Sequence, residues 1–201
     1  MGDQRGGIDL ACFDEGKDLG IEIEDNVKLV NATNPIIEVI RKSIVPTQLC
    51  QVRINNTFAP DFGVFEVGRV VEGYREDGLC NEKKKLAITL FSKTKSMQEI
   101  YFELRDILAT LALDLKHLSL SYETIEATHC YQHPKNLNKI ICGGKVLGEI
   151  GIANSVVSKN IDKKANIVFA EIDIEEFAKI KNASISYAEP SKFPEIEIDL
   201  S

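Results

Sequence analysis

The sequence lacks three features that would each have pointed to a particular class of protein. No apolar run approaches the ~20 residues that a membrane-spanning helix needs, so we expect no membrane role. The five cysteines are an odd number at irregular spacings, which is typical of a chain in reducing cytosol. Basic residues are outnumbered, since 24 Lys and Arg face 31 Asp and Glu. Nucleic-acid binding needs clustered cations, so we expect other domains to hold any RNA.

What the chain does have is enough apolar content for the core of one domain, with 44% of its 201 residues hydrophobic. Alternating runs at residues 62–71 and 86–91 predict an antiparallel hairpin, with the polar stretch 72–85 as its loop. The predicted fold class is α+β, an antiparallel sheet flanked by helices. Further strands are predicted at residues 118–125, 139–142, 145–151 and 167–172.

The clearest predicted helix opens at a capping box, in which Ser96 and Glu99 can each satisfy the other's backbone amide. A second cap, Asp173 with Glu176, predicts a short helix that runs through Ile180. The long helix has a wide apolar stripe at helical spacing, made of Ile100, Leu104, Ile107, Leu108, Leu111 and Leu115.

Two helix-start signals precede these elements. At Asn34-Pro35 the Asn side chain can cap a helix, and the proline fits the first helical position, where it costs no hydrogen bond. Pro46 is a second proline of this kind. They predict short helices over residues 36–41 and 47–55, with a break between.

The same region resembles a known family in order and spacing. It reads Asn34-Pro35, then Arg41-Lys-Ser-Ile-Val-Pro46, then a helix ending in Asn55-Asn56, then Phe65-Glu-Val-Gly68. A second block runs from His133-Pro134 through the glycine-containing strands of residues 140–151. From about Asp9 onward the chain is similar to the beta subunit of bacterial phenylalanine-tRNA ligase.

The resemblance implies a class II aminoacyl-tRNA synthetase core-like domain over residues 9–186. Residues 1–8 are then expected to be a disordered start, and residues 187–201 to begin a linker into a C-terminal anticodon-recognition domain. It also implies a cytoplasmic module with no catalytic, cofactor or metal residues of its own. Its partner would be the alpha subunit, which uses ATP and Mg to attach phenylalanine to tRNA, and tRNA would contact other domains.

In class II enzymes a helix and strand around a proline build the subunit interface, so the resemblance places that interface in residues 41–69. The expected interface residues are Arg41, Ser43, Pro46, Arg53, Asn56, Glu66 and Arg69.

A catalytic class II site would need two arginines to clamp ATP phosphates, because a rigid guanidinium fork binds phosphate bidentately. The last arginine is Arg105, so the late clamp has no counterpart. Lys179 or Lys181 lies near the right place, yet a lysine is a point charge and a poor copy. Arg69 could be the early clamp, and we favour a solvated charge at a strand edge.

Other groups admit a functional and a structural interpretation. His129, Cys130, His133 and Cys142 could suggest a metal site, but paired short spacings are missing, which favours a turn at His133-Pro134 and two small buried thiols.

The glycine motifs and the lysine run each have a structural and a functional interpretation. Gly143-Gly144 and Gly148-x-x-Gly151 fit a hairpin turn and close strand packing better than a phosphate loop. Residues 83–85, all lysine, are expected at a solvated hairpin tip, with RNA contact as the alternative.

Two departures from the family pattern weaken the transfer of individual residues, namely Ala153-Asn154 in place of a His-Pro and Ile198 in place of an arginine. The main rival hypothesis is an autonomous regulatory module that binds a small ligand on a class II scaffold. An apolar pocket with convergent polar groups would favour it. A complete enzyme with a lysine-based ATP site is a third hypothesis.

Overall fold

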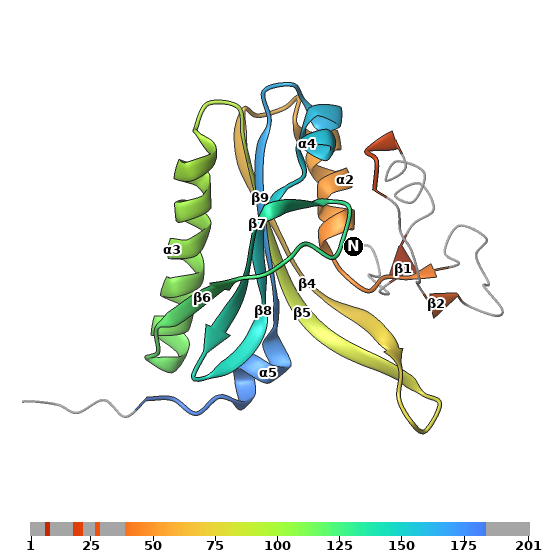
Figure 1. Cartoon of the computed structure of the whole chain (residues 1–201), viewed down its shortest axis with the longest axis vertical. Coiled ribbons are helices and arrows are strands. Elements are labelled where there is room, and N and C mark those ends of the chain that lie inside the picture. The colour runs from red at the N-terminus through yellow and green to blue at the C-terminus, as the bar shows by residue number, and fades with distance from the viewer. Residues whose placement is uncertain (1–6, 9–17, 22–26, 29–38, 184–201) are drawn as a thin grey trace, which may run out of the picture.

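A six-stranded antiparallel sheet forms the centre of the protein (Figure 1). The computed structural model describes residues 7–8, 18–21, 27–28 and 39–183. The strand order is β4-β5-β9-β8-β7-β6, which confirms the predicted α+β class. The strands are β4 (Asp61–Tyr74), β5 (Cys80–Ser92), β6 (Leu120–Thr124), β7 (Gln132–Cys142), β8 (Lys145–Ala153) and β9 (Asn166–Asp173). A small sheet, in the order β1-β3-β2, is built from β1 (Gly7–Ile8), β2 (Val27–Lys28) and β3 (Val39–Ile40).

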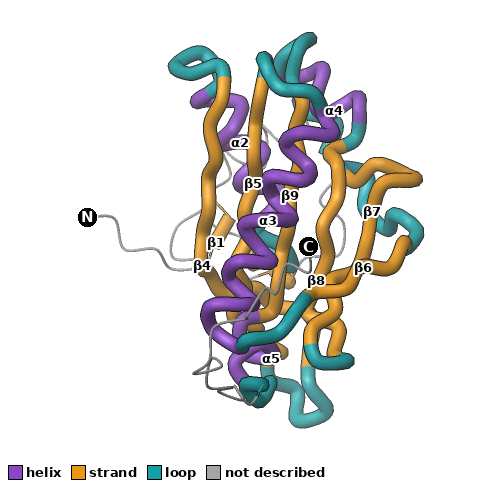
Figure 2. The backbone as a smooth tube through the Cα atoms, turned by 90° about the vertical axis from the view of Figure 1, so that its left-hand side faces the viewer, coloured by secondary structure: helices purple, strands orange, loops and turns teal. Residues whose placement is uncertain are grey.

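Helices cover both faces of the central sheet (Figures 1 and 2). The long helix α3 (Met97–Lys116) packs on one face, and α2 (Val45–Asn55) with α4 (Ser155–Ile161) packs on the other. The short helix α5 (Ile174–Lys179) follows β9 directly. We call the face that α2 covers the front face. No helix in the described residues is both long and apolar enough to span a membrane.

Helix α3 begins at the predicted capping box, in which both reciprocal hydrogen bonds are present. It ends at His117, whose φ of 55° lies in the left-handed region. The predicted apolar stripe is only partly correct, because Ile107 and Leu115 are 40% and 54% exposed. The helix buries one narrow i, i+4 row against the sheet, made of Ile100, Leu104, Leu108 and Ala112.

The predicted hairpin is confirmed, but its loop is much shorter than residues 72–85. The turn lies between Arg75 and Leu79, where the Arg75 amide donates to the Leu79 carbonyl at 2.8 Å. The prediction was wrong because the polar run on β5 looked like loop. Lys83 and Lys85 instead pair with carboxylates on the front face, so the lysines are part of the strand.

Helix predictions fared unevenly. The 47–55 helix is confirmed as α2, and Asp173 caps α5 by accepting from the Glu175 and Glu176 amides. The predicted 36–41 helix is wrong at Val39–Ile40, which form β3, while residues 36–38 lie outside the described residues. Helix α4 was not predicted, although the Asn154 side chain caps it. The predicted linker at residues 187–201 also lies outside the described part.

The glycine predictions are confirmed in their structural form. Gly143 and Gly144 have φ values of 55° and 78° and make the turn between β7 and β8. Gly148 pairs with Ile172 on β9, and a Cβ at Gly148 would overlap the backbone oxygen of Glu171. Only glycine therefore lets β8 and β9 approach at this point.

We expect Gly148→Ala to cost more than about 3 kcal/mol of unfolding free energy, because two backbones would have to separate in the middle of the sheet. Gly144→Ala is the matched control: no atom lies within 4 Å of its added Cβ, so the cost is the left-handed conformation alone, about 1 kcal/mol. Urea unfolding of both variants measures the difference. Equal costs would contradict the packing argument.

Candidate functional site

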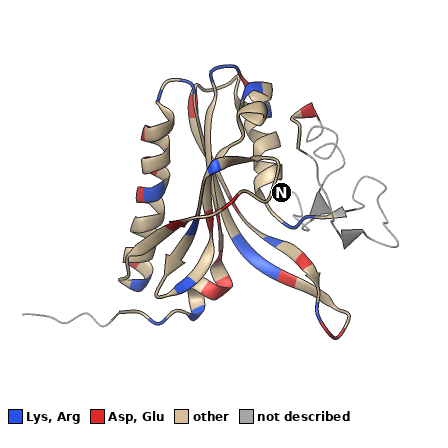
Figure 3. Ribbon diagram, in the orientation of Figure 1, with Lys and Arg blue, Asp and Glu red and all other residues tan. Residues whose placement is uncertain are grey.

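A row of charged side chains crosses the front face from one edge of the sheet to the other. Successive strand registers align its members, so their side chains point to the same side. The charged members are Glu66 on β4, Glu171 on β9, Glu149 on β8, Lys139 on β7 and Glu123 on β6, and the uncharged Ala87 on β5 lies between Glu66 and Glu171. Figure 3 shows charges of both signs along these strands. Carboxylates dominate the row.

Glu171, at the centre of the row, holds the start of α2 against the sheet. One of its carboxylate oxygens accepts from the Ile44 amide at 2.6 Å and from the Ser43 hydroxyl at 3.1 Å. Ile44, the N-cap residue of α2, has no capping side chain of its own. The distant carboxylate therefore supplies the acceptor and negative charge that a helix N-terminus favours.

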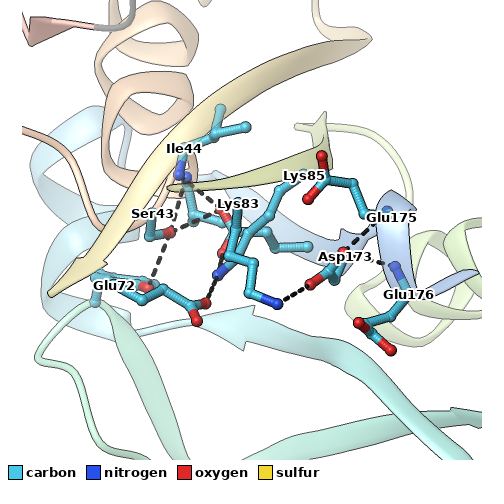
Figure 4. Close-up of polar contacts among 11 residues, drawn as sticks. Ser43, Ile44, Glu72, Lys83, Lys85, Asp173, Glu175 and Glu176 are labelled. Carbon is cyan, nitrogen blue, oxygen red and sulfur yellow. Dashed lines mark hydrogen bonds and ion pairs between the residues drawn. The ribbon is translucent and has the colours of Figure 1, made fainter. Parts of the chain in front are cut away.

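Lys85 neutralises the other oxygen of Glu171. Its ammonium lies 3.3 Å from Glu171 and 2.8 Å from Glu72, and only 15% of the side chain is exposed. Burial tends to lower the pKa of Lys85, but the two carboxylates outweigh it and raise that pKa. Beside this pair, Lys83 lies 3.3 Å from Asp173 (Figure 4). Both lysines are therefore engaged by carboxylates of the domain.

Glu149 lies in the same row with less compensation. The Gln132 amide donates to its carboxylate at 2.6 Å. Burial, and next the charge of Glu171, raise the pKa of Glu149. Nearby, the His129 ring stacks on Tyr131 with centroids 5.3 Å apart, and burial lowers the pKa of His129. The Tyr131 phenol is buried, which raises its pKa well above its usual range.

Arg41 fills the β4 end of the face. Its guanidinium pairs with Glu66 and its Nε donates to the Arg69 carbonyl at 3.4 Å. A Cβ at Gly68 would meet that guanidinium, so glycine makes the room that Arg41 occupies. The Arg of one motif and the Glu and Gly of the Phe-Glu-Val-Gly motif are thus one packed unit, which explains their joint presence in the sequence.

Comparison with known proteins identifies the family. The family model described as phenylalanyl tRNA synthetase beta chain CLM domain matches residues 14–174. The chain belongs to this CLM domain family. It is similar to the phenylalanine-tRNA ligase beta subunit of Syntrophus aciditrophicus, at 26% identity over 96% of this chain and 24% of that subunit. The corresponding subunit of Bacteroides thetaiotaomicron is 32% identical over 66% of this chain and 16% of its own length.

The family assignment covers a piece of a larger kind of protein, since the chain spans about a quarter of the length of the first of these relatives. Among solved structures, the pyrrolysyl tRNA synthetase PylSc of Desulfitobacterium hafniense is similar with a TM-score of 0.59 and 14% identity. That likeness covers 88% of this chain and 60% of PylSc. It confirms the class II core-like fold of the CLM domain.

The seven residues predicted for the subunit interface divide into an inner and an outer group. Arg41 is 6% exposed, and Ser43 and Glu66 are held with it in the front-face network. Pro46 starts α2, as predicted.

The outer group lies on the surface of α2 and β4. Arg53, in the last turn of α2, lies 3.7 Å from Asp18, and Asn56 caps the same helix. Arg69 is 72% exposed and lies 2.7 Å from Glu82, so it has the exposed position that we favoured over a phosphate clamp.

The metal and clamp alternatives receive no support from the geometry. Among the described residues, no three His, Cys, Asp or Glu side chains are grouped to hold a metal ion. Cys142 is buried as expected, whereas Cys130 is exposed, so the prediction of two buried thiols is wrong for Cys130. Lys179, the candidate substitute clamp, lies 2.6 Å from Glu176 within α5.

Sequence reasoning missed an exposed apolar surface on the outer side of β4 and at the hairpin tip. Phe65 and Val67 are 77% and 47% exposed, although their strand neighbours Phe62 and Val64 pack into the core. The missed signal was that β4 is apolar on both faces, which is unusual for a strand at a sheet edge. Tyr74 and Leu79 are exposed at the hairpin tip.

We expect Gly68→Ala to destabilise the CLM domain by roughly 1–3 kcal/mol, because the methyl group displaces the Arg41 guanidinium from Glu66. In an Arg41→Ala background the same change should cost about 1 kcal/mol less, since the displaced group is gone. Gly63→Ala on the same strand is the control, whose cost should not depend on Arg41. A double-mutant cycle by urea unfolding measures the coupling, and additive costs would contradict it.

A second prediction concerns the pH dependence that Glu149 confers. Its folded-state pKa is raised, so the folded protein prefers the protonated carboxyl, and this contribution is lost as pH rises from the usual pKa of about 4.3 through the folded value. Glu149→Gln should therefore raise Tm at pH 7.5 by roughly 2–4 °C.

The gain should become much smaller near pH 4, where Glu149 is mostly protonated in both states. Calorimetry at both pH values tests this. An equal gain at the two values would assign the effect to packing. Exposed Glu126→Gln is the control, with no expected gain at either pH.

Proposed function

We propose that the chain is the non-catalytic CLM module of a phenylalanine-tRNA ligase beta subunit and that it pairs with the alpha subunit. The alpha subunit would perform the ATP-dependent attachment of phenylalanine to tRNA, with ATP and Mg bound there and tRNA held by other domains, in the cytoplasm. This chain would have a structural role: it would hold the heteromer together through the surface of α2 and β4.

The observation that carries this proposal is the internal neutralisation of the front face. Arg41, Lys83 and Lys85 each pair with a carboxylate of the same domain. A site for ATP needs cations whose donors are directed at the phosphates. Here the carboxylates Glu66, Asp173 and Glu171 already occupy them, and they would repel a phosphate. The family assignment and this electrostatic arrangement favour the same function.

Within the part of the chain that the structure describes, the small-ligand alternative has no comparable observation in its favour. The cavity between α3 and the sheet holds about 10 Å³, and the one beside Asp61 and Lys95 holds about 170 Å³. Pockets for small ligands usually have about 300–1,000 Å³. A wider hollow of about 580 Å³ at Phe102 and Ile107 lies open on the outer side of α3, where it encloses little.

Light scattering on size-exclusion fractions should find one complex when the chain is mixed with the alpha subunit from the same organism. Reversing the charges of half-buried Arg53 and exposed Arg69, by Arg53→Glu with Arg69→Glu, should weaken the complex by roughly tenfold or more. Arg41 is unsuitable for this test because its reversal would leave a charge buried against Glu66.

Lys145→Glu, on the turn between β7 and β8, is the matched control and should leave the complex unchanged. The isolated chain should show no ATP-dependent pyrophosphate exchange. Exchange activity would contradict the non-catalytic role, and a monomer indifferent to the alpha subunit would contradict the pairing role.

A further inference from the structure

Strand β4 is one edge of the central sheet, so the N–H and C=O groups of alternate residues face either β5 or the open side of the sheet. The Lys93 amide donates to the Pro60 carbonyl beside the pair Asp61↔Ser92, which makes that pair one without direct hydrogen bonds. Even-numbered residues of β4 therefore bond to β5, and odd-numbered ones direct their N–H and C=O groups outward.

Arg41 occupies the outward groups at one end of this edge. Its carbonyl accepts from the Val71 amide at 2.9 Å, and its side chain donates to the Arg69 carbonyl. Beyond Arg69, at Gly63, Phe65 and Val67, the outward groups have no hydrogen-bond partner among the described residues. Along this edge, Arg41 thus binds the outward groups of Arg69 and Val71, and the outward groups of the next three odd-numbered residues are unpaired among the described residues.

The open stretch has one of the features that usually protect a sheet edge, the inward charge of Glu66, and that charge is already paired with Arg41. Natural edges are shortened, bulged, or interrupted by proline or inward charges. The strand β4 is 14 residues long, contains no proline, and has its register shift only after Val71. Between Gly63 and Val67 it exposes two large apolar side chains, Phe65 and Val67. An edge of this kind pairs with another strand wherever one is available.

We propose that the edge of β4 at residues 63–67 is where an extended segment of the alpha subunit adds a seventh strand to this sheet. The segment fits if it has apolar residues at alternate positions, which would cover Phe65 and Val67 on the side away from α2. Its main chain would continue the row of hydrogen bonds that Arg41 begins. This inference rests on the proposed pairing function and specifies how that pairing occurs.

Val67→Pro tests the backbone contribution directly. It removes an outward N–H that the isolated domain does not use and places the proline ring at the open edge, so the β4–β5 hydrogen bonds remain. Val67→Thr is the matched control, because it keeps the N–H and nearly the same shape. We expect Val67→Pro to weaken the complex at least about 30-fold, and Val67→Thr less than about fivefold.

Residue-resolved amide exchange gives a second readout in the unaltered chain. The amides of Phe65 and Val67 should exchange freely in the isolated chain and slow at least about tenfold in the complex, whereas those of Val64 and Glu66 are protected in both. Circular dichroism and thermal unfolding are the checks that Val67→Pro remains folded.

The outcomes separate the two proposals. If the wild-type chain binds the alpha subunit and Val67→Pro binds equally well, strand addition at this edge is overturned while the pairing function stands. If the wild-type chain does not bind, both are overturned. Protection of Phe65 and Val67 amides in the isolated monomer would show that this chain covers its own edge, and a concentration-dependent dimer would assign the edge to a second copy. Either result overturns the proposal.

Discussion

The carboxylate of Glu171 is the interaction on which the front of this domain depends. It is 6% exposed and sits in the middle of the sheet, yet it accepts from Ile44 and Ser43, which belong to the start of α2. A buried carboxylate is costly unless hydrogen bonds and an opposite charge compensate it. Two donors on one oxygen and Lys85 on the other meet both conditions. The Glu171 side chain therefore both caps the start of α2 and fixes its position on the sheet.

This arrangement has a direct consequence for chemistry on the face. Enzymes that transfer nucleotides keep preorganised cations facing the position that the substrate phosphates will occupy. Here the cations stabilise the fold by meeting the domain's own carboxylates, and Glu149 adds a further acidic group whose pKa burial raises. The basic side chains Arg41, Lys83 and Lys85 are thus paired within the domain, and the remaining charge on the face is acidic.

Much of the fold could be predicted from local sequence because local signals and the final structure agree. The capping box at Ser96 and the Gly143-Gly144 turn are local devices, and both appear as predicted. The charged row could not be predicted in this way, since its members come from six strands and meet only through the register of five pairings. Lys83 and Lys85 show the difficulty: their polarity indicated a loop, and only distant carboxylates make them strand residues.

The interface prediction shows the same limit at the level of the site. The family resemblance directed attention to charged residues such as Arg41, whose buried position gives it an internal partner. The exposed apolar positions on β4 depend instead on the end of the sheet order, which no local pattern reveals.

The paired basic side chains of the front face and the unpaired backbone groups at the β4 edge are complementary properties of one domain. The internal ion pairs fix β4 and its neighbours without outside help, so the strand keeps its extended shape before any partner arrives. A preorganised edge loses little conformational entropy on pairing, and this lowers the cost of association. Arg41 joins the two properties, because the same residue closes the network through Glu66 and begins the hydrogen-bond row along the edge. The ion pairs that order the front face therefore also make the edge a suitable place for a partner strand.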